Sequence, residues 1–350
     1  MIRPETVAQL ADALRTLAEA RKTIRLGGNF TKDRIGGPIC PADETVSTSA
    51  MRRLLKYEPR DLTISVEAGM PWADLERTLA EQRQMLPLDP AFCLEDPGAT
   101  VGGVIAANQS GPLRRQYGTA RDMVIGMTFV TLDGREIRTG GNVVKNVAGL
   151  DMGKLMAGSF GTLAAIAAVN FKVFPIPPAS RTFVMEFGAA ADAFAERDRI
   201  LRGQLPPAAI DIVNWGPFEQ KQAFRLLVRA MGTAAVVERF TREFTHARAL
   251  DGDEQTALWR EIREFTRQFL DANPYGAVVA IPSSLSSMRE VAEALNMPFI
   301  ARAGSGVTYA HYADDPPAVA VRDDAEMMKR VKRMFDPENL LNRGRLYGYL

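Results

Sequence analysis

The chain has 350 residues, of which 46% are hydrophobic and 24% charged, and its formal net charge at pH 7 is +1. This composition is ordinary for a globular protein, and the length is sufficient for two domains. A charge balance this close to zero argues against binding to nucleic acid or to an anionic membrane surface. Because no run of 18 apolar residues occurs, we also expect no direct insertion into a membrane.

The N-terminal segment predicts a helix over 4–21, followed by a short strand over 23–26 that ends at Gly27 and Gly28. Residues 1–20 alternate apolar and charged side chains and contain no apolar core of signal-peptide type. We therefore expect a cytoplasmic protein, with any membrane association made through partners.

Five further elements are predicted before a proline-rich linker. A strand over 62–67 is followed by a helix over 71–83 that has proline in its first turn. Asp133 and Gly134 join strands over 124–132 and 135–139 as a hairpin. A last strand over 163–174 stops at the prolines of 175–178, which predict the linker.

The second half alternates strands and helices again. Strands are expected over 182–187, 210–214 and 224–230, and helices over 190–202 and 234–249. We expect the same alternation of strands and helices to continue in the segments 277–282, 285–295, 299–303 and 307–312. An amphipathic helix is expected over 323–335. These lengths indicate an antiparallel sheet covered by helices on one face.

Three glycine-dense turns are the most informative feature of the first half. They lie at 24–31, 96–108 and 158–163 and predict a large ligand held by backbone groups. At 96–108 the small residues open a helix, so we expect bare amide groups there; the alternative is a tight helix start packed on a neighbour. None of the three has the spacing of a Rossmann fingerprint, a P-loop or a nucleophile elbow.

The order of these turns resembles the flavoprotein family of vanillyl-alcohol oxidase and p-cresol methylhydroxylase (PCMH). In that family a glycine loop after the first strand holds the FAD pyrophosphate, a Pro-Gly-x-Thr-Val-Gly-Gly segment lines the flavin, and a Gly-Ser-x-Gly-x-Leu turn lies near the adenine. The matching residues here are 26–29, 97–108 and 158–163, together with a Gly-x-x-Arg-Asp element over 118–122. The resemblance covers about residues 1–178.

A narrower resemblance is to the FAD-binding subunits of glycolate oxidases. It lies in the segments 142–151, 110–115 and 85–87, with Leu150 where those subunits usually have tyrosine and Ala164-Ala165 where glycine is common. The ending over 335–346 is similar to the Phe-Asp-Pro…Leu-Asn-Pro-Gly-Arg ending of the same flavoproteins. That ending returns to their flavin domain.

The resemblance implies an α+β fold in three parts. A bipartite PCMH-type FAD-binding domain would span 1–178, a smaller α+β, ferredoxin-like cap domain would span 179–325, and 326–350 would be the returning tail.

The resemblance also implies a set of cofactor-binding residues. Arg121 and Asp122 belong to it, although they fit a structural ion pair equally well. The full set is Gly27, Gly28, Asn29, Thr31, Pro87, Asp89, Pro97, Gly98, Thr100, Val101, Gly102, Gly103, Ala106, Asn108, Gly118, Arg121, Asp122, Gly158, Gly161, Leu163 and Ile166.

The small number of histidines and cysteines limits the flavin linkages, metal sites and catalytic bases that the chain can provide. Covalent flavin attachment in this family commonly uses a histidine near the first loop, and none precedes His246, so we expect non-covalent FAD. Cys40 and Cys93 are too few for an iron–sulfur cluster or a Cys-rich zinc site; a disulfide or a flavin thioether remains an alternative to two idle thiols. His311, on an expected strand, is the best candidate for a catalytic base, and no metal site is expected.

Three functions fit these features. The first is an FAD-binding subunit of a glycolate oxidase-type, 2-hydroxy-acid dehydrogenase complex that relays electrons between a sister flavin subunit and an iron–sulfur subunit. The second is a self-sufficient FAD oxidoreductase for a small hydroxy acid or alcohol. The third is a scaffold subunit that holds FAD for structural reasons.

Overall fold

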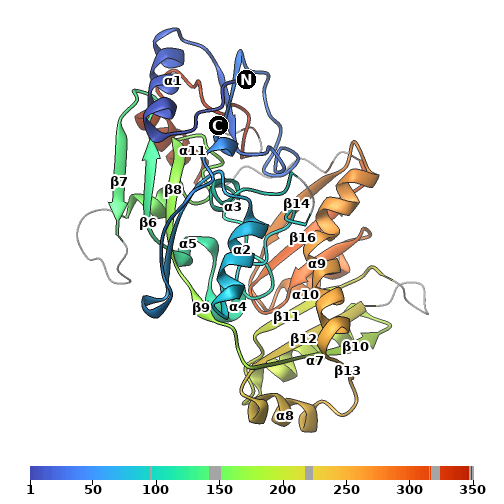
Figure 1. Ribbon diagram of the computed structural model, residues 1–350. Coiled ribbons are helices and arrows are strands. Elements are labelled where there is room, and N and C mark those ends of the chain that lie inside the picture. The colour runs from blue at the N-terminus through green and yellow to red at the C-terminus, as the bar shows by residue number, and fades with distance from the viewer. Residues whose placement is uncertain are drawn as a thin grey trace. The chain divides into compact units, whose positions relative to one another are not determined.

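The computed structural model describes residues 1–94, 97–141, 151–216, 224–314, 316, 324–346 and 348. The chain forms two compact units (Figure 1). Unit 1 comprises Met1–Gln109, Thr119–Pro175 and Ala318–Leu350, and unit 2 comprises Ser110–Gly118 and Ile176–Pro317. The segment 110–118, which the sequence expectation placed with the flavin domain, thus groups with unit 2. Residues 142–150 of the glycolate-oxidase-like pattern lie outside the described residues.

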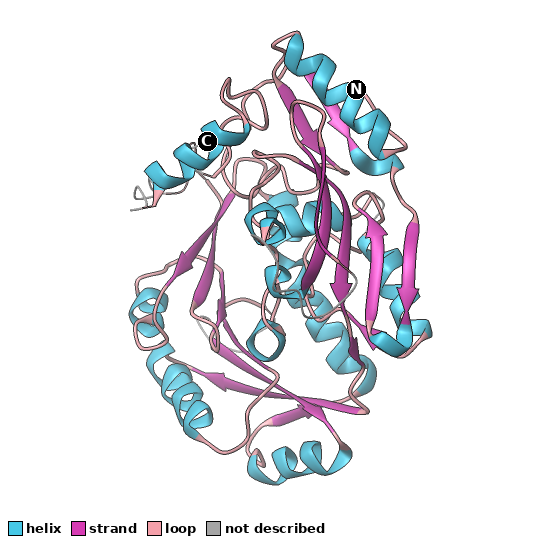
Figure 2. Cartoon of the chain, turned by 90° about the vertical axis from the view of Figure 1, so that its left-hand side faces the viewer, coloured by secondary structure: helices cyan, strands magenta, loops and turns pink. Residues whose placement is uncertain are grey.

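Unit 1 is built on a five-stranded antiparallel sheet in the order β3-β4-β8-β6-β7 (Figure 2). Its strands are β3 (Leu54–Glu58), β4 (Thr63–Glu67), β6 (Val124–Val130), β7 (Glu136–Gly140) and β8 (Ala165–Lys172). Two small sheets accompany it. They are the parallel pair β1 (Ile24–Gly27) and β2 (Glu44–Ser47), and the antiparallel pair β5 (Gln84–Met85) and β9 (Phe174–Pro175).

Unit 1 has three longer helices, which are α1 (Val7–Glu19), α2 (Trp72–Glu81) and α11 (Ala325–Phe335). Its shorter helices are α3 (Val101–Ala106), α5 (Ala120–Met123) and α6 (Met152–Met156), with 3₁₀ turns η1 (Thr48–Ala50) and η2 (Pro59–Asp61). The apolar stripe of α1 packs through Leu10 and Leu14 into a core shared with Ile24, Val130 and Leu341. The first strand and the C-terminal tail therefore belong to one hydrophobic core.

Unit 2 contains a seven-stranded sheet in which every pairing is antiparallel, in the order β13-β10-β12-β11-β15-β16-β14. The first part runs β10 (Ala179–Phe187), α7 (Ala190–Arg202), β11 (Ala209–Val213), β12 (Phe224–Gly232), α8 (Ala234–Glu243) and β13 (Arg248–Leu250). This βαββαβ order, with β13 and β10 side by side, is the ferredoxin-like arrangement. The expected α+β class is confirmed.

Helices cover both faces of that sheet, so the expectation of helices on one face was wrong. Phe194 of α7 and Phe240 of α8 pack on one face together with α10 (Met288–Glu293). On the other face, Leu258 and Ile262 of α9 (Gly252–Ala272) pack beside α4 (Arg114–Tyr117). The remaining strands are β14 (Ala277–Pro282), β15 (Phe299–Arg302) and β16 (Val307–Tyr312).

Contacts within unit 2 explain why 110–118 belongs to it. The guanidinium of Arg115 donates to the carbonyl oxygens of Pro207 at 3.2 Å and Gly304 at 3.3 Å, and Leu113 is buried in the core on the α9 side of the sheet.

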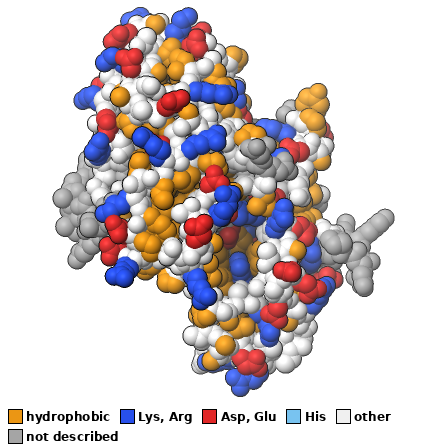
Figure 3. Space-filling view, in the orientation of Figure 1, with side chains coloured by type: hydrophobic (Ala, Val, Ile, Leu, Met, Phe, Trp, Pro, Cys, Tyr) orange, Lys and Arg blue, Asp and Glu red, His pale blue; other side chains and the backbone are white. Residues whose placement is uncertain are grey.

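Figure 3 shows acidic and basic side chains interspersed over the visible face, as the near-neutral charge of the chain leads one to expect.

Candidate functional site

A pocket in unit 1 encloses about 660 Å³ of empty space, part of it open to solvent. Its walls come from the loop after β1, from α3 and from the turn that precedes β8, with one residue of the C-terminal tail. The lining residues are Leu26, Gly27, Gly28, Asn29, Phe30, Thr31, Lys32, Asp33, Thr48, Thr100, Gly102, Gly103, Ala106, Ala107, Phe160, Gly161, Ala164, Ile166 and Arg345.

The loop after β1 presents four consecutive amide groups without protein acceptors. Its carbonyl and side-chain groups are engaged: Ser47 Oγ donates to Gly28 O at 2.8 Å, and Asn29 Nδ2 donates to Gly98 O at 2.8 Å. The N–H groups of residues 28–31 have no acceptor within the described part of the chain, and Phe30 adopts a positive φ of 57°. Successive amides in such a turn form a concave binding site for an anion.

The start of α3 is different, and here the expectation of bare amides was wrong. Val101 N donates to Met70 O at 2.9 Å, and Gly102 N donates to Ala68 O at 2.7 Å. Gly103 N donates to the N-cap hydroxyl of Thr100 at 3.3 Å. The first three amides of this helix are therefore satisfied by the protein itself.

Three of the pocket glycines are required by protein packing. A Cβ on Gly28 would lie 2.2 Å from Thr100 Oγ1, and a Cβ on Gly102 would lie 2.8 Å from the Cβ of Ala68. Gly161 has φ of +68°, and its Cβ would lie 2.8 Å from Asn342 Nδ2. The absence of side chains at these positions brings β1, α3 and the turn at 158–163 together, instead of only leaving space for a ligand.

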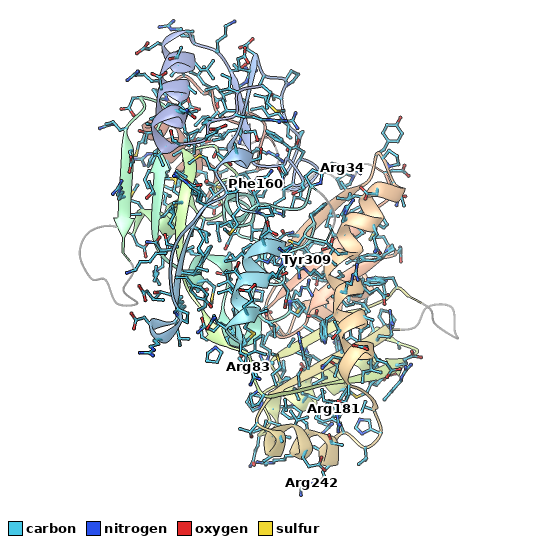
Figure 4. All side chains as sticks on the ribbon, in the orientation of Figure 1. Arg34, Arg83, Phe160, Arg181, Arg242 and Tyr309 are labelled. Carbon is cyan, nitrogen blue, oxygen red and sulfur yellow. The ribbon has the colours of Figure 1, made fainter. Side chains whose placement is uncertain are left out.

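The C-terminal tail holds two walls of the pocket. Asn342 Nδ2 donates to Leu26 O at 2.9 Å and to Phe160 O at 2.8 Å, and its Oδ1 accepts from Leu26 N at 2.7 Å. Arg345 donates to the carbonyl oxygens of the loop over 32–35 and lies 5.7 Å from the centroid of the Phe160 ring, which is labelled in Figure 4. The tail thus returns to the unit that contains the pocket.

The tail is anchored by a buried ion pair. Lys332 Nζ contacts the carboxylate of Asp336 and donates to Thr162 O at 2.8 Å and Leu341 O at 2.9 Å. Burial lowers the pKa of Lys332, whereas Asp336 raises it. Because the Asp336 carboxylate also accepts from Leu340 N and Leu341 N, each at 2.8 Å, it fixes the turn that leads to Asn342.

The charged groups of the pocket are two cations and one anion. Lys32 Nζ lies 3.4 Å from Ala91 O and 5.3 Å from the Phe92 ring. Asp33 forms ion pairs with Arg345 at 3.0 Å and with Arg25. Burial lowers the pKa of Arg345, but an arginine stays charged at neutral pH. The pocket therefore favours a ligand with negative charge.

The predicted cofactor residues divide into two groups. Ten of them line the pocket: Gly27, Gly28, Asn29, Thr31, Thr100, Gly102, Gly103, Ala106, Gly161 and Ile166. Eleven do not: Pro87, Asp89, Pro97, Gly98, Val101, Asn108, Gly118, Arg121, Asp122, Gly158 and Leu163. Sequence reasoning missed Arg345, Lys32 and Phe160; the Gly-Arg ending was a signal for the first of these.

Arg121 and Asp122 have a structural explanation that does not involve a ligand. The Asp122 carboxylate accepts from Thr119 N and Thr119 Oγ1, each at 2.8 Å, as the capping box of α5. Burial alone would raise the pKa of Asp122, but the two hydrogen bonds from Thr119 bring it below its usual value. Arg121 is exposed, and its backbone N donates to Asn108 Oδ1 at 3.1 Å.

Asp89 is a buried carboxylate outside the pocket lining. Its Oδ2 has no hydrogen-bond partner within the described residues, and its φ is +44°. The neighbouring Phe92 also has a positive φ, of 67°, and its carbonyl oxygen accepts from Ala99 N at 2.6 Å. The strained loop around 89–92 thus packs against the start of the Pro97–Thr100 segment.

His311 lies in the interior of unit 2, which argues against its prediction as a catalytic base. Its side chain is 0% exposed, and the rings of Phe265 and Phe269 contact it edge-on with centroids at 4.8 and 5.3 Å. Nε2 lies 3.0 Å from Thr266 Oγ1. Burial lowers the pKa of His311 to about 4, so the ring is neutral at pH 7. Within the described residues the ring is thus enclosed by Phe265, Phe269 and Thr266.

The other candidate groups are simple to place. Cys40 is exposed and Cys93 is buried, and the two are not joined by a disulfide. Within the described ranges, no cluster of three or more His, Cys, Asp or Glu side chains has metal-binding geometry. No helix in the described part of the chain is long and apolar enough to cross a bilayer.

Part of the chain matches a known family, and two named proteins are similar to it in sequence. Residues 1–140 match the family described as "FAD binding domain". The "Glycolate oxidase subunit GlcE" of Escherichia coli is 29% identical over 343 residues, which is 92% of both chains. The "D-lactate dehydrogenase [cytochrome] 1, mitochondrial" of Saccharomyces cerevisiae is 33% identical over 190 residues, but these span only 31% of that protein and 54% of this chain.

Solved structures share the fold. An alkyldihydroxyacetonephosphate synthase superposes with a TM-score of 0.74 over 97% of this chain and 75% of that one, at 16% identity. "Wild-type Phl p 4.0202, a glucose dehydrogenase" gives a TM-score of 0.70 over 99% and 89% of the two chains, also at 16% identity. At these identities the likeness supports the fold alone.

Proposed function

We propose that the chain, whose residues 1–140 match the family described as "FAD binding domain", is a flavoprotein of the vanillyl-alcohol oxidase and PCMH type. In this proposal it binds FAD non-covalently as a subunit of a 2-hydroxy-acid oxidoreductase complex of the glycolate oxidase kind. FAD itself supplies the redox chemistry when it is bound. The chain's residues bind and orient the cofactor.

The observation that carries this proposal is the row of amides at 28–31, for which the described part of the chain supplies no acceptor. A dinucleotide has a pyrophosphate with two negative charges, and consecutive amide donors are suited to hold such a group without a side-chain cation. Ser47 fixes the carbonyl of Gly28, and the side chain of Asn29 is bonded to the carbonyl of Gly98, so the loop is held in place before the anion binds. Lys32 and Arg345 add positive charge to the same pocket.

The subunit role is supported by three features of the chain. Its similarity to a protein named as a glycolate oxidase subunit covers 92% of both sequences. His311 is enclosed by Phe265 and Phe269, so it does not supply an accessible base. Two cysteines cannot ligate an iron–sulfur cluster. We propose that a sister flavin subunit holds the complete active site and that this chain passes electrons from it to an iron–sulfur subunit in the cytoplasm.

Purification from the native source tests the proposal. The chain should co-purify with a second flavin chain and an iron-containing chain, and acid or heat should release its FAD from the polypeptide. Flavin that stays on the denatured chain would refute non-covalent binding. Turnover of glycolate or D-lactate by the isolated chain would instead support a self-sufficient oxidoreductase, and an assembled complex whose flavin in this chain is not reduced during turnover would support a scaffold.

A further inference from the structure

The loop that carries the free amides is held from the far end of the sequence by one side chain. Arg345 Nη1 donates to Ile35 O at 2.9 Å, to Asp33 O at 3.2 Å and to Lys32 O at 3.3 Å. Three carbonyl groups of one loop thus converge on one guanidinium nitrogen. Because the C=O of one residue and the N–H of the next belong to one peptide unit, these bonds fix the peptide units that follow residues 32, 33 and 35. They therefore anchor the chain directly after the amides at 28–31 and limit the movement of that loop.

The same guanidinium is fixed from a second side by Asp33. Arg345 Nη2 contacts Asp33 Oδ1 at 3.0 Å, and the other oxygen of this carboxylate contacts Arg25. Arg25 in turn lies 4.4 Å from the centroid of the Phe30 ring, whose backbone belongs to the amide row. Asp33 is therefore an acidic residue in the wall of an anion-binding pocket, and its position is explained by the two arginines that it orients.

Two buried polar atoms of this cluster, Arg25 Nε and Arg345 Nε, have no hydrogen-bond partner within the described residues, and of the two arginines only Arg345 lines the pocket. Arg345 is 6% exposed and lines the pocket, yet its buried Nε has no hydrogen-bond partner within the described residues. A buried arginine N–H group without an acceptor is costly unless a ligand supplies one.

From these contacts we infer that Arg345 is a positioning residue for the pyrophosphate of the cofactor, and that Asp33 holds it in place. The inference rests on the proposed FAD function. Arg345 orients the loop whose amides bind the anion, and its own charge adds to the attraction. A lysine cannot replace it, because a single ammonium does not span three carbonyls and a carboxylate at once.

The test compares two conservative variants in the same tail. Arg345→Lys and Arg343→Lys both retain the charge, but Arg343 lies outside the pocket lining, and its side chain donates to Pro41 O at 2.8 Å. The full-length chain is stripped of flavin and titrated with FAD and with ADP, which has the diphosphate without the flavin. We expect Arg345→Lys to weaken both affinities by about 10- to 100-fold and Arg343→Lys to leave both within about twofold.

Asp33→Asn separates positioning from simple charge. If the pocket acted only through its net charge, removal of this carboxylate would tighten FAD binding. Positioning predicts the opposite, a weakening of about tenfold or more. Melting of the FAD-free variants, expected within a few degrees of the wild type, distinguishes a lost site from a lost fold.

Each outcome has a defined meaning. Wild-type affinity in Arg345→Lys, tighter binding in Asp33→Asn, or weaker FAD with unchanged ADP binding would each overturn the inference and leave the proposed function standing. Failure of the wild-type chain itself to bind FAD would overturn the proposed function. If Arg345→Lys does not fold, the Asp33→Asn titration alone decides.

Discussion

The loop at 28–31 and the start of α3 resemble each other in sequence but not in chemistry. Both are rich in small residues, both lie on the wall of the same pocket, and Gly28 and Thr100 touch. In the loop the amides have no acceptor within the described residues, whereas at α3 the three leading amides donate to Met70, Ala68 and Thr100. Whether a donor already has a partner, and not the density of glycine, separates a ligand site from tight packing.

The largest effect is expected from Gly28→Val, which alters both regions at once. Its Cβ would lie 2.2 Å from Thr100 Oγ1 and 2.7 Å from Thr100 Cγ2, so the loop must move away from α3. We expect FAD affinity to fall by more than about 100-fold, as measured by titration of the apoprotein. Gly188→Val is the control, since a Cβ there meets nothing within 4 Å. Normal FAD content in folded Gly28→Val would remove the loop from the site.

In unit 2, His311 is enclosed by protein side chains, so it resembles the start of α3 and not the loop at 28–31. We therefore expect His311→Gln to change stability and not turnover. Because folding lowers the pKa of His311 from 6.5 to about 4, the unfolded chain binds the extra proton between these values. The stabilisation from burying the neutral ring is complete above pH 6.5 and is lost as the pH falls towards 4. It amounts to roughly 3 kcal/mol at most.

Denaturation of wild type and His311→Gln across pH 4–7 measures this difference, and the slope should flatten in the variant. In the intact complex, turnover should fall by less than about tenfold. A loss of about 100- to 10,000-fold with the fold and FAD content preserved is the signature of a general base. Such a loss would show that His311 is a functional group after all.

Gly102→Ala tests whether the space at the start of α3 is needed for packing within the protein. The added Cβ would lie 2.8 Å from the Cβ of Ala68 and 3.1 Å from its carbonyl oxygen. Overpacking of this kind costs about 1–3 kcal/mol, measurable by denaturant unfolding of the FAD-free chain. Adding Ala68→Gly should restore part of this loss, because it removes one of the two contacts. Wild-type stability with lost FAD binding would mean that the space at Gly102 belongs to the ligand.

The smallest effect is expected from Asp122→Asn, which weakens the capping box of α5. A lost cap costs about 1 kcal/mol. Since folding lowers the pKa of Asp122, the wild type should keep its advantage above the ordinary aspartate pKa of 3.8 and lose it at lower pH. Arg121→Ala is the companion variant and should leave stability within about 0.5 kcal/mol and FAD affinity unchanged. Loss of FAD in either variant would return the pair to the cofactor site.

The sequence was sufficient for elements whose pattern is local. The stripe of Leu10, Leu14 and Leu17 predicts α1, and the Asp133-Gly134 turn predicts the β6–β7 hairpin, both confirmed. The helix predicted over 234–249 ends at Glu243, and the long helix α9 was missed. Its spacing of Leu258, Ile262 and Phe265 was a usable signal.

Contacts between distant residues could not be read from the sequence. The amides of Val101 and Gly102 donate to the carbonyls of Met70 and Ala68. In the sequence, α2 and β5 lie between these two residues and α3. Arg345 reaches a loop 310 or more positions earlier, and the enclosure of His311 depends on α9. A glycine run indicates a special backbone but does not reveal which neighbour requires it.

The position of Arg345 has a consequence for how the protein matures. During synthesis the loop at 28–31 emerges well before Asn342 and Arg345, and residues this far apart in sequence associate slowly. A nascent chain that has not reached these two residues has the glycine loop without the side chains that hold it. On the proposed role of Arg345, we expect cofactor loading to follow synthesis of residues 342–345 and a product truncated before them to lack flavin.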